Sequence, residues 1–245
     1  IVVTGGTGRF GRELKKMTSH NYLFPSKKEL DILKLNNILK YLKKIKPKYL
    51  IHLAGFSRPM VDHEKNISKS ITLNIIGTSN IVIACEKLKI KLIYFSTSYV
   101  YEGTKGNYRE TDPVLPCNNY AWSKIGGEAA VQMYKNSLII RISMTEKPFV
   151  HKFAYANMKT NFIFHKDVIP IIKKILNKTG VLNVGGPTQT VYKFAKQYNS
   201  KIKKILLKKN DKLMPKNASM NLSKLRKRIL AILNSVPKRG KVSRR

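Results

Sequence analysis

Acidic side chains are scarce in this chain of 245 residues, which has 13 Asp and Glu against 48 Lys and Arg and a formal net charge of +35. Such a balance raises the question of nucleic acid as a partner. Lysines are, however, spread along every predicted helix, and no aromatic platform or recognition motif lies among them, so we expect no specific nucleic-acid partner. Only the segment 235–245, SVPKRGKVSRR, is predicted to be a basic, disordered tail.

Cysteines are also few, and long apolar runs are lacking. Cys85 and Cys117 have no metal-type spacing, so we expect free thiols, no disulfide framework and no metal site. No run of about 18 apolar residues exists, and the N-terminus lacks a charged segment followed by an apolar stretch, which predicts neither a membrane span nor a secretory signal. We therefore expect a cytoplasmic protein. The chain opens inside a strand without an initiator Met, so a few residues are expected to be missing.

The pattern of hydrophobic residues, which make up 42% of the chain, predicts an α/β fold. β-Branched runs alternate with segments of helical periodicity, and this alternation is typical of a parallel sheet covered by helices, a Rossmann-type doubly wound sheet. The predicted strands are the opening IVVTGG and residues 21–24, 49–54, 91–96 and 137–143; the predicted helices are 9–18, 34–45, 68–88 and one that starts near Tyr120.

The alternation loosens after Ser143. A helix at 165–176, a short strand and turn at 180–186 and a helix at 190–198 follow. We therefore predict an NAD(P)-binding Rossmann domain over 1–143 and a reduced C-terminal substrate-binding lobe over 144–234.

A glycine-rich turn, TGGTGRFG at 4–11, follows the first strand and precedes a helix. Gly5 permits the tight turn, Gly8 lets backbone N–H groups approach a pyrophosphate, and Gly11 allows close packing of the helix on the strand. The turn therefore predicts dinucleotide binding.

The segment CNNYAWSK, 117–124, sets Tyr120 and Lys124 four positions apart on one helix face. A fixed positive charge favours the phenolate form of a tyrosine, so the pair can act as a tuned acid or base. Thr97 ends the fourth predicted strand, at the sheet edge where the dinucleotide is expected. Its hydroxyl can bond a substrate oxygen while Tyr120 transfers a proton to it and Lys124 holds the charge of the phenol and the cofactor ribose. These three residues are the predicted catalytic set.

Several stretches together resemble the extended branch of the short-chain dehydrogenase/reductase superfamily, over roughly residues 1–190. Within it, STSYVYEG and PKNASMNLSKL are most similar to the dTDP-4-dehydrorhamnose reductase family. The resemblance implies reduction of the C4 ketone of a nucleotide-linked 4-keto-6-deoxyhexose, with hydride going to C4 and a proton from Tyr120 to the oxygen. It is carried by TGGTGRFG, HLAG, LNIIGTSNI, FSTSYVY, ETDPVLPCNNYAWSKIGGE and PKNASMNLSKL.

The resemblance also implies the residues that bind the cofactor. At the end of the second strand, Pro25, Ser26 and Lys27 stand where an acid would mark the ribose of NAD, which favours NADP(H), with NAD(H) as the alternative. Asp31 and Ile32 resemble the pair that contacts adenine, and they also suit a helix cap and a core position. The complete predicted set is Gly5, Thr7, Gly8, Arg9, Phe10, Gly11, Ser26, Lys27, Asp31, Ile32, Leu53, Ala54, Gly55, Asn74, Tyr120 and Lys124.

One replacement excludes an alternative activity, and one departure from the family pattern leaves others open. Ser98 and Tyr99 replace the Asp-Glu pair of the sugar-nucleotide dehydratases, so dehydration is not expected. The stretch after RISM is short, which leaves a sugar-nucleotide epimerase and a non-catalytic regulatory subunit, like that of methionine adenosyltransferase, as alternatives. Phe149, His151 and Arg58 are candidates for the pocket. The expected partner is a small-molecule nucleotide sugar, and the sequence leaves a homodimer open.

Overall fold

A computed structural model describes residues 1–208, 211 and 213–235, with the side chains of the last helix as far as Leu230. The predicted basic tail, 235–245, lies outside the described residues except for Ser235, which ends that helix.

The central sheet is parallel and has the strand order β1-β2-β3-β4-β9. Its strands are β1 (Val2–Thr4), β2 (Tyr49–His52), β3 (Lys91–Thr97), β4 (Ser137–Ile142) and β9 (Gly180–Val184). Nearly every strand position is buried, since helices cover both faces, and this is why the strands read as continuous apolar runs. The predicted doubly wound α/β fold is confirmed.

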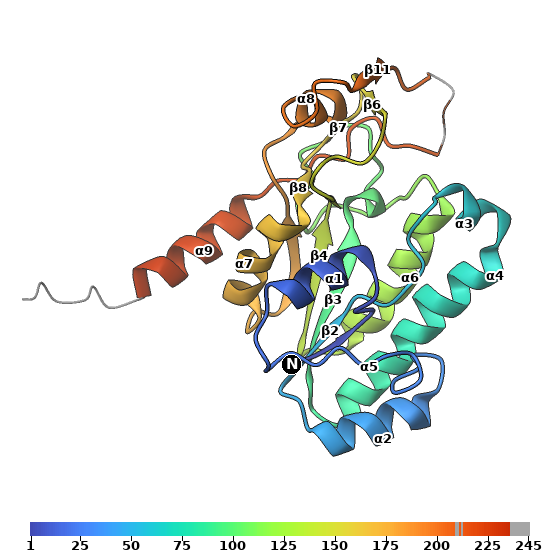
Figure 1. Cartoon of the computed structure of the whole chain (residues 1–245), viewed down its shortest axis with the longest axis vertical. Helices are drawn as coiled ribbons and strands as arrows, with labels where there is room; N and C mark the ends of the chain where they lie inside the picture. The colour runs from blue at the N-terminus through green and yellow to red at the C-terminus, as the bar shows by residue number, and fades with distance from the viewer. Residues whose placement is uncertain (209–210, 212, 236–245) are drawn as a thin grey trace, which may run out of the picture.

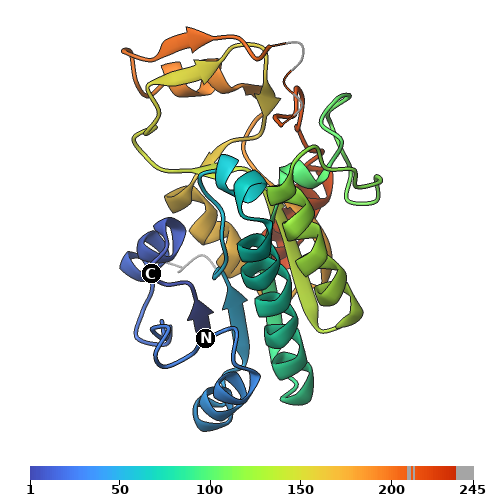
Figure 2. The same cartoon turned by 90° about the vertical axis from the view of Figure 1, so that its right-hand side faces the viewer.

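Helices cover both faces of the sheet, which gives three layers (Figures 1 and 2). Two apolar cores hold these layers together. On one face, Ile93 and Ile140 pack against α1 (Arg9–Lys16), α7 (His165–Ile175) and α9 (Ser223–Ser235). On the other, Leu92 and Ile139 pack against α2 (Leu35–Ile45), α5 (Gly77–Lys87) and α6 (Asn119–Met133). Neighbouring residues of one strand thus enter opposite cores, as the pleat requires.

The predicted second strand, 21–24, is reduced to one bridge between Val2 and Leu23. Leu23 donates its N–H to the carbonyl of Ile1 and accepts from Val3, both at 2.8 Å. Pro25 has no N–H with which to extend the ladder. The segment nevertheless lies beside β1 on the side away from β2, so the chain reverses direction across the sheet at β1, as in doubly wound folds.

The predicted helix 68–88 is a composite of α4 (Ile67–Ser70), a π-helical turn η1 (Ile71–Ile76) and α5. As a whole, Ile67–Lys87 has the length and apolar composition of a membrane span. Its residues Ile81 and Cys85 are fully buried in the core beneath the sheet, which is the packing of a core helix.

An upper lobe, at the top of Figure 1, sits over the carboxyl ends of the strands. Its apolar centre is built around Phe149, Phe164 and Phe194. The lobe contains α8 (Val191–Lys196) and three two-stranded sheets, formed by β5 (Met144–Thr145) with β8 (Ile163–Phe164), β6 (Phe153–Tyr155) with β11 (Lys203–Ile205), and β7 (Lys159–Thr160) with β10 (Gln189–Thr190).

The predicted division at residue 143 does not follow these layers. β9 lies next to β4 in the main sheet, and α7 and α9 cover that sheet, although all three come from the predicted lobe 144–234. The periodicity of 165–184 continues the βα alternation, and its apolar residues fill the same core as those of β1–β4. Residues beyond 143 therefore build both the upper lobe and part of the main sheet with its covering helices.

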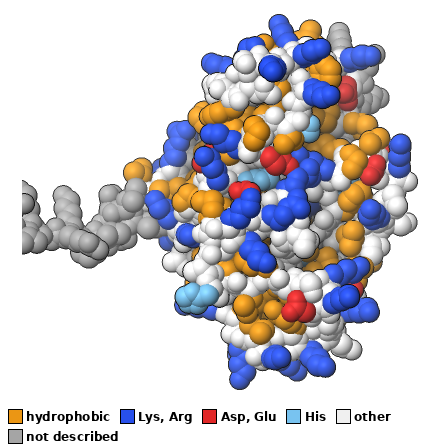
Figure 3. All heavy atoms as spheres, viewed as in Figure 1, with side chains coloured by type: hydrophobic (Ala, Val, Ile, Leu, Met, Phe, Trp, Pro, Cys, Tyr) orange, Lys and Arg blue, Asp and Glu red, His pale blue; other side chains and the backbone are white. Residues whose placement is uncertain are grey.

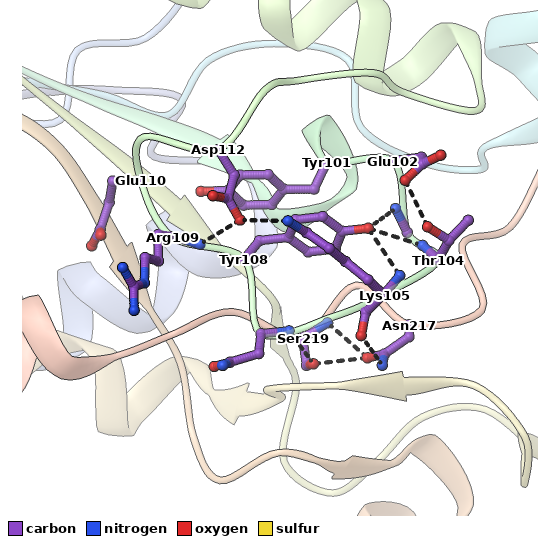
Figure 4. A network of polar contacts seen from close by, with 12 residues as sticks. Tyr101, Glu102, Thr104, Lys105, Tyr108, Arg109, Glu110, Asp112, Asn217 and Ser219 are labelled. Carbon is purple, nitrogen blue, oxygen red and sulfur yellow. Dashed lines mark hydrogen bonds and ion pairs between the residues drawn. The ribbon is translucent and has the colours of Figure 1, made fainter.

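A polar network ties two of the stretches that carried the family resemblance (Figure 4). The Tyr108 hydroxyl accepts hydrogen bonds from the backbone N–H groups of residues 103–105 at 3.0 to 3.3 Å. Asn217 donates to the carbonyl of Lys105 at 3.1 Å, and Tyr108 donates its N–H to the carbonyl of Ser219 at 3.0 Å. The segment that leads into α6 is thus fixed against the segment that leads into α9.

Candidate active site

A cavity of about 1020 Å³ opens at the carboxyl ends of the strands, between the sheet and the upper lobe. Parallel sheets bind ligands at this edge. The sheet side of the wall comes from the glycine-rich turn, the loop after β2, the end of β3 and the start of α6. The lobe side is largely apolar and includes Phe149, Met158 and Phe162, together with His151. Phe149 and His151 therefore lie where they were predicted.

The glycine-rich turn is shaped as predicted for an anion. Gly5 has φ +75°, and a Cβ at this position would lie 2.5 Å from the backbone nitrogen of Ala54, so a side chain has no room. Gly8 caps α1 without a side-chain hydrogen bond, and the first residues of that helix line the cavity. A helix start of this kind attracts phosphate. The turn therefore fits the pyrophosphate of a dinucleotide.

The structure brings together most of the predicted cofactor-binding residues. Ten of them line the cavity: Gly5, Gly8, Arg9, Phe10, Gly11, Leu53, Gly55, Asn74, Tyr120 and Lys124.

The other predicted cofactor residues do not line this cavity. Thr7 is exposed on the turn, and Ala54 follows β2 behind Gly5. Asp31 accepts a hydrogen bond from the N–H of Leu33 at 3.0 Å, and the buried Ile32 packs on Gly77 of α5.

Ser26 and Lys27 lie at the end of the 21–24 segment, outside the cavity lining. The backbone N–H and hydroxyl of Ser26 both donate to the Glu29 carboxylate, at 2.7 and 2.8 Å, while Lys27 is exposed. The Glu29 carboxylate thus lies at Ser26, a position at which the sequence itself has no acidic residue.

Thr97, Tyr120 and Lys124 share one wall of the cavity. Thr97 ends β3, and the other two lie in the first turns of α6, which begins after Asn118. The Asn118 side chain accepts from the N–H of Ala121 at 2.9 Å, which explains why the helix begins there. The predicted triad is therefore brought together; its catalytic role stays a prediction.

Burial raises the pKa of the Tyr120 phenol. The same pKa is lowered in part by a hydrogen bond with Thr97 and by the charges of Arg58 and Arg9. The predicted effect of Lys124 on the phenol stays a prediction. Fixed positive charge near the hydroxyl thus comes from Arg9, a predicted cofactor-binding residue, and from Arg58, a candidate for the pocket.

Lys124 is placed over an aromatic ring. Its Nζ lies 4.2 Å from the centroid of the Tyr94 ring, and the Tyr94 hydroxyl donates to the Lys124 carbonyl at 3.1 Å. Burial lowers the pKa of Lys124 to about 7, against the opposing effect of Glu128 one helical turn away. An ammonium with this pKa can change its charge near neutral pH.

Asn74 holds the loop after β2 against α6. It lies in the π-helical turn, donates to the Phe56 carbonyl and to the Ser123 hydroxyl at 2.8 Å each, and accepts from the Phe56 N–H at 2.7 Å. Single π-turns often occur at functional sites. The predicted role of Asn74 in cofactor binding stays a prediction.

Sequence reasoning missed the support behind Tyr120. His63, in α3 (Val61–Lys65), is fully buried, stacks on Phe56 with ring centroids 4.2 Å apart, and meets the Tyr120 ring edge-on at 5.1 Å. The Glu64 carboxylate accepts from the N–H of Asn119 at 2.8 Å. A lone His and a lone Glu in a polar stretch give no signal of such contacts.

A second missed feature is a carboxylate beside two arginines. Glu146, just after β5, lies 3.2 Å from Arg9 Nε and 3.3 Å from Arg58 Nη1. Both arginines line the cavity, from the glycine-rich turn and from the loop after β2. Arg58 was a candidate for the pocket; Glu146 carried no motif that identified it.

Basic side chains are not confined to the cavity. Figure 3 shows Lys and Arg spread over the whole of the face drawn, with few acidic side chains among them. This face shows a dispersed charge rather than one basic groove for nucleic acid.

Comparisons with known proteins agree with this geometry. The family model described as RmlD substrate binding domain matches residues 1–163. The methionine adenosyltransferase 2 subunit beta of Pongo abelii is 29% identical over 142 residues, which cover 54% of this chain and 42% of that protein. The dTDP-4-dehydrorhamnose reductase of Burkholderia thailandensis is 28% identical over 135 residues, 54% of this chain and 45% of that protein. The chain thus spans less than half the length of these curated relatives.

Among solved structures, the dTDP-4-dehydrorhamnose reductase of Bacillus anthracis in complex with NADP superposes with a TM-score of 0.83 at 23% identity, over 96% of this chain and 92% of that one. The Bordetella bronchiseptica enzyme WbmG in complex with NAD and UDP gives 0.72 at 17% identity, over 93% and 87%. At these identities the likeness shows the fold.

Proposed function

The chain belongs to the family described as RmlD substrate binding domain, and from this premise we propose that it is a nicotinamide-dependent reductase of a nucleotide-linked 4-keto-6-deoxyhexose. The observation that carries the proposal is the placement of Thr97, Tyr120 and Lys124 on one wall of a cavity that also contains the glycine-rich turn. A hydroxyl, a phenol and an ammonium around one space suit the protonation of a ketone oxygen.

The residues present fit a dinucleotide. The close approach at Gly5 leaves room only for backbone, and the start of α1 presents N–H groups to an anion. Gly5, Gly8 and Arg9 would hold the pyrophosphate, and Lys124 the nicotinamide ribose. When bound, a reduced nicotinamide supplies the hydride.

The chain's own residues supply the proton. Thr97 donates a hydrogen bond to the ketone oxygen and fixes its position beside the phenol. Tyr120 gives its proton to that oxygen as negative charge develops there, and the charges of Arg58 and Arg9 stabilise the resulting phenolate. We assign the same role to Lys124. Asn74 fixes the position of the loop after β2, and His63 fixes the position of the Tyr120 ring, by the contacts described above.

For the cofactor we propose NADP(H), with NAD(H) as the alternative. Lys27 is exposed at the end of the 21–24 segment and can reach a 2′-phosphate. The Ser26 hydroxyl, however, donates to Glu29, and this carboxylate favours the unphosphorylated ribose. We also expect the enzyme to act in the cytoplasm.

The test is to follow NADPH absorbance with dTDP-, UDP- and GDP-linked 4-keto-6-deoxyhexoses. Oxidation of NADPH with one of them, lost in Tyr120→Phe, supports the reductase. The active-site tyrosine variant thus distinguishes turnover at this site from a contaminating activity.

A second candidate is a non-catalytic, cofactor-binding subunit. It is favoured by the relatives named as the beta subunit of methionine adenosyltransferase 2, of which that of Pongo abelii is 29% identical over 54% of this chain. NADPH binding without oxidation of any of the three sugars would favour this candidate over the reductase.

A further inference from the structure

Glu146 joins three separate parts of the cavity wall. Its Oε1 lies 3.2 Å from Arg9 Nε, and its two oxygens lie 3.3 and 3.5 Å from Arg58 Nη1. The Thr145 hydroxyl, itself buried, donates to Oε2 at 3.3 Å. The glycine-rich turn, the loop after β2 and the segment that enters the upper lobe therefore meet at one carboxylate.

Glu146 contacts the two arginines but does not itself line the cavity. Arg9 and Arg58 line the cavity, with 40% and 31% of their side chains exposed, whereas Glu146 lies outside the lining and is 18% exposed. A guanidinium has five N–H donors. Arg9 contacts the carboxylate through Nε and Arg58 through Nη1, so the other nitrogens of both groups are not committed to Glu146.

The cavity wall has a single sign of charge. Its described lining contains Arg9, Arg58, Lys124 and Lys152, and no Asp or Glu among the residues that the structure describes. A wall of this kind, built on the unsatisfied start of a helix, suits a ligand with more than one negative charge.

We propose that Arg9 and Arg58 form a two-arginine clamp for a diphosphate, and that Glu146 is the positioning residue that holds the two guanidinium groups side by side. The nature of the ligand rests on the proposed function, since both a dinucleotide and a nucleotide-linked sugar contain a diphosphate. Planar guanidinium groups match phosphate oxygens in a bidentate manner, and two of them can take the two phosphoryl groups of one ligand.

The carboxylate is needed because the arginines repel one another. Burial and the charge of Arg58 lower the pKa of Arg9, and Glu146 acts in the opposite direction. Without the carboxylate, two like charges on flexible side chains would move apart and the spacing of the clamp would be lost.

The test measures binding of this chain to pairs of ligands, of which one contains a diphosphate and the other only a monophosphate, by titration calorimetry without turnover. UDP against UMP represents the substrate diphosphate, and ADP-ribose against AMP represents the cofactor diphosphate. In the unmodified protein we expect the diphosphate of at least one pair to bind about tenfold or more tightly than its monophosphate, since each charge-assisted contact corresponds to about ten- to hundredfold in affinity.

Arg58→Gln should remove that preference while the monophosphate affinity changes less than about threefold. Loss in the UDP pair assigns the clamp to the substrate, and loss in the ADP-ribose pair assigns it to the cofactor. Arg58→Lys keeps the charge but not the planar fork, and should restore only part of the preference. An unchanged preference in both pairs in folded Arg58→Gln protein overturns the clamp.

Glu146→Gln tests the positioning role. We expect the diphosphate preference to fall by about threefold or more although the cavity becomes more positive. Tighter diphosphate binding in this variant would mean that the carboxylate competes with the ligand, and would overturn the positioning role.

Arg12→Gln is the matched control, because Arg12 lies in the same helix, is exposed and does not line the cavity. It should leave the preference unchanged. A thermal melt of each variant shows that it is folded. Because no step requires sugar reduction, the clamp can hold if the reductase proposal fails, and the reverse is also true.

Discussion

Glu128 and Arg141 form an ion pair that is almost closed to water: Arg141 Nη2 lies 2.7 Å from Glu128 Oε2, and 4% and 2% of the two side chains are exposed. Arg141 Nη1 also donates to the Tyr101 hydroxyl at 3.1 Å. Although burial opposes it, Glu128 holds the pKa of Arg141 above its usual value. The same carboxylate partly offsets the burial that lowers the pKa of Lys124, so the ion pair also acts on the candidate site.

We expect Glu128→Gln to lower the free energy of unfolding by about 3 to 5 kcal/mol, because it leaves a buried guanidinium without its counter-charge. Urea unfolding followed by circular dichroism measures this. The matched control is Asp112→Asn, which removes the partner of Lys105 in a pair whose lysine is 63% exposed; it should cost less than about 1 kcal/mol. Equal losses in the two variants would contradict the expected difference between buried and exposed pairs.

Tyr120→Phe should lower turnover by about 10²- to 10⁴-fold, the range typical of general acid catalysis, and leave NADPH binding nearly unchanged. Steady-state rates with the reducible sugar and a separate titration with NADPH distinguish the two effects. Trp122→Phe, an exposed position in the same helix turn, serves as the control and should keep its activity. Retained turnover in Tyr120→Phe would remove the phenol from the proposed mechanism.

Lys124→Met should abolish most turnover and weaken NADPH binding, because one ammonium serves the phenol and the ribose. Its effect on stability should depend on pH. Since burial lowers the pKa of Lys124 to about 7, the unfolded state binds more protons than the folded state between pH 7 and about 10. The unmodified protein therefore gains stability from this group as pH rises through that range.

The methionine variant lacks this gain. We expect Lys124→Met to be stabilised relative to the unmodified protein at pH 6, with the difference shrinking toward pH 10. Urea unfolding at both pH values measures it. A difference that does not change with pH would show that Lys124 titrates at its ordinary pKa.

Cofactor preference should be modest. Lys27 alone can attract a 2′-phosphate, because the Ser26 hydroxyl is held by Glu29. One charge-assisted contact corresponds to about tenfold in kcat/KM in favour of NADPH. Ser26→Asp with Lys27→Ala should reverse the preference, since it removes the attraction and adds repulsion.

Glu29→Gln is the informative companion, because it releases the Ser26 hydroxyl and removes a negative charge. It should increase the preference for NADPH. Equal specificity constants for the two cofactors, unmoved by either change, would mean that this loop does not contact the ribose.

The features that could be predicted from the sequence are those that depend on residues close together along the chain. The glycine-rich turn, the Tyr120–Lys124 spacing and the alternation of strands and helices depend on neighbours along the chain, and each places its element within a few residues. The position of Thr97 followed from the rule that parallel strands end at one edge.

The features that could not be predicted are contacts between distant residues. Glu146 lies far along the chain from Arg9, and His63 reaches Tyr120 from another helix; a polar residue in a loop carries no sign of its partner. The predicted strand at 21–24 is reduced to one bridge for a local reason, because Pro25 cannot extend the ladder. The place of β9 in the main sheet depends instead on which core its apolar residues fill.

The return of β9 to the main sheet also limits how this protein can be divided. The chain leaves the sheet after β4, builds part of the upper lobe, comes back for α7 and β9, leaves again, and returns for α9. A fragment cut at residue 143 would expose β4 as a bare edge and strip α1 of its neighbour α7. The upper lobe is therefore not a separate domain that could be exchanged as a block between relatives. Any opening of the cavity must also bend all of the segments that link the lobe to the main sheet.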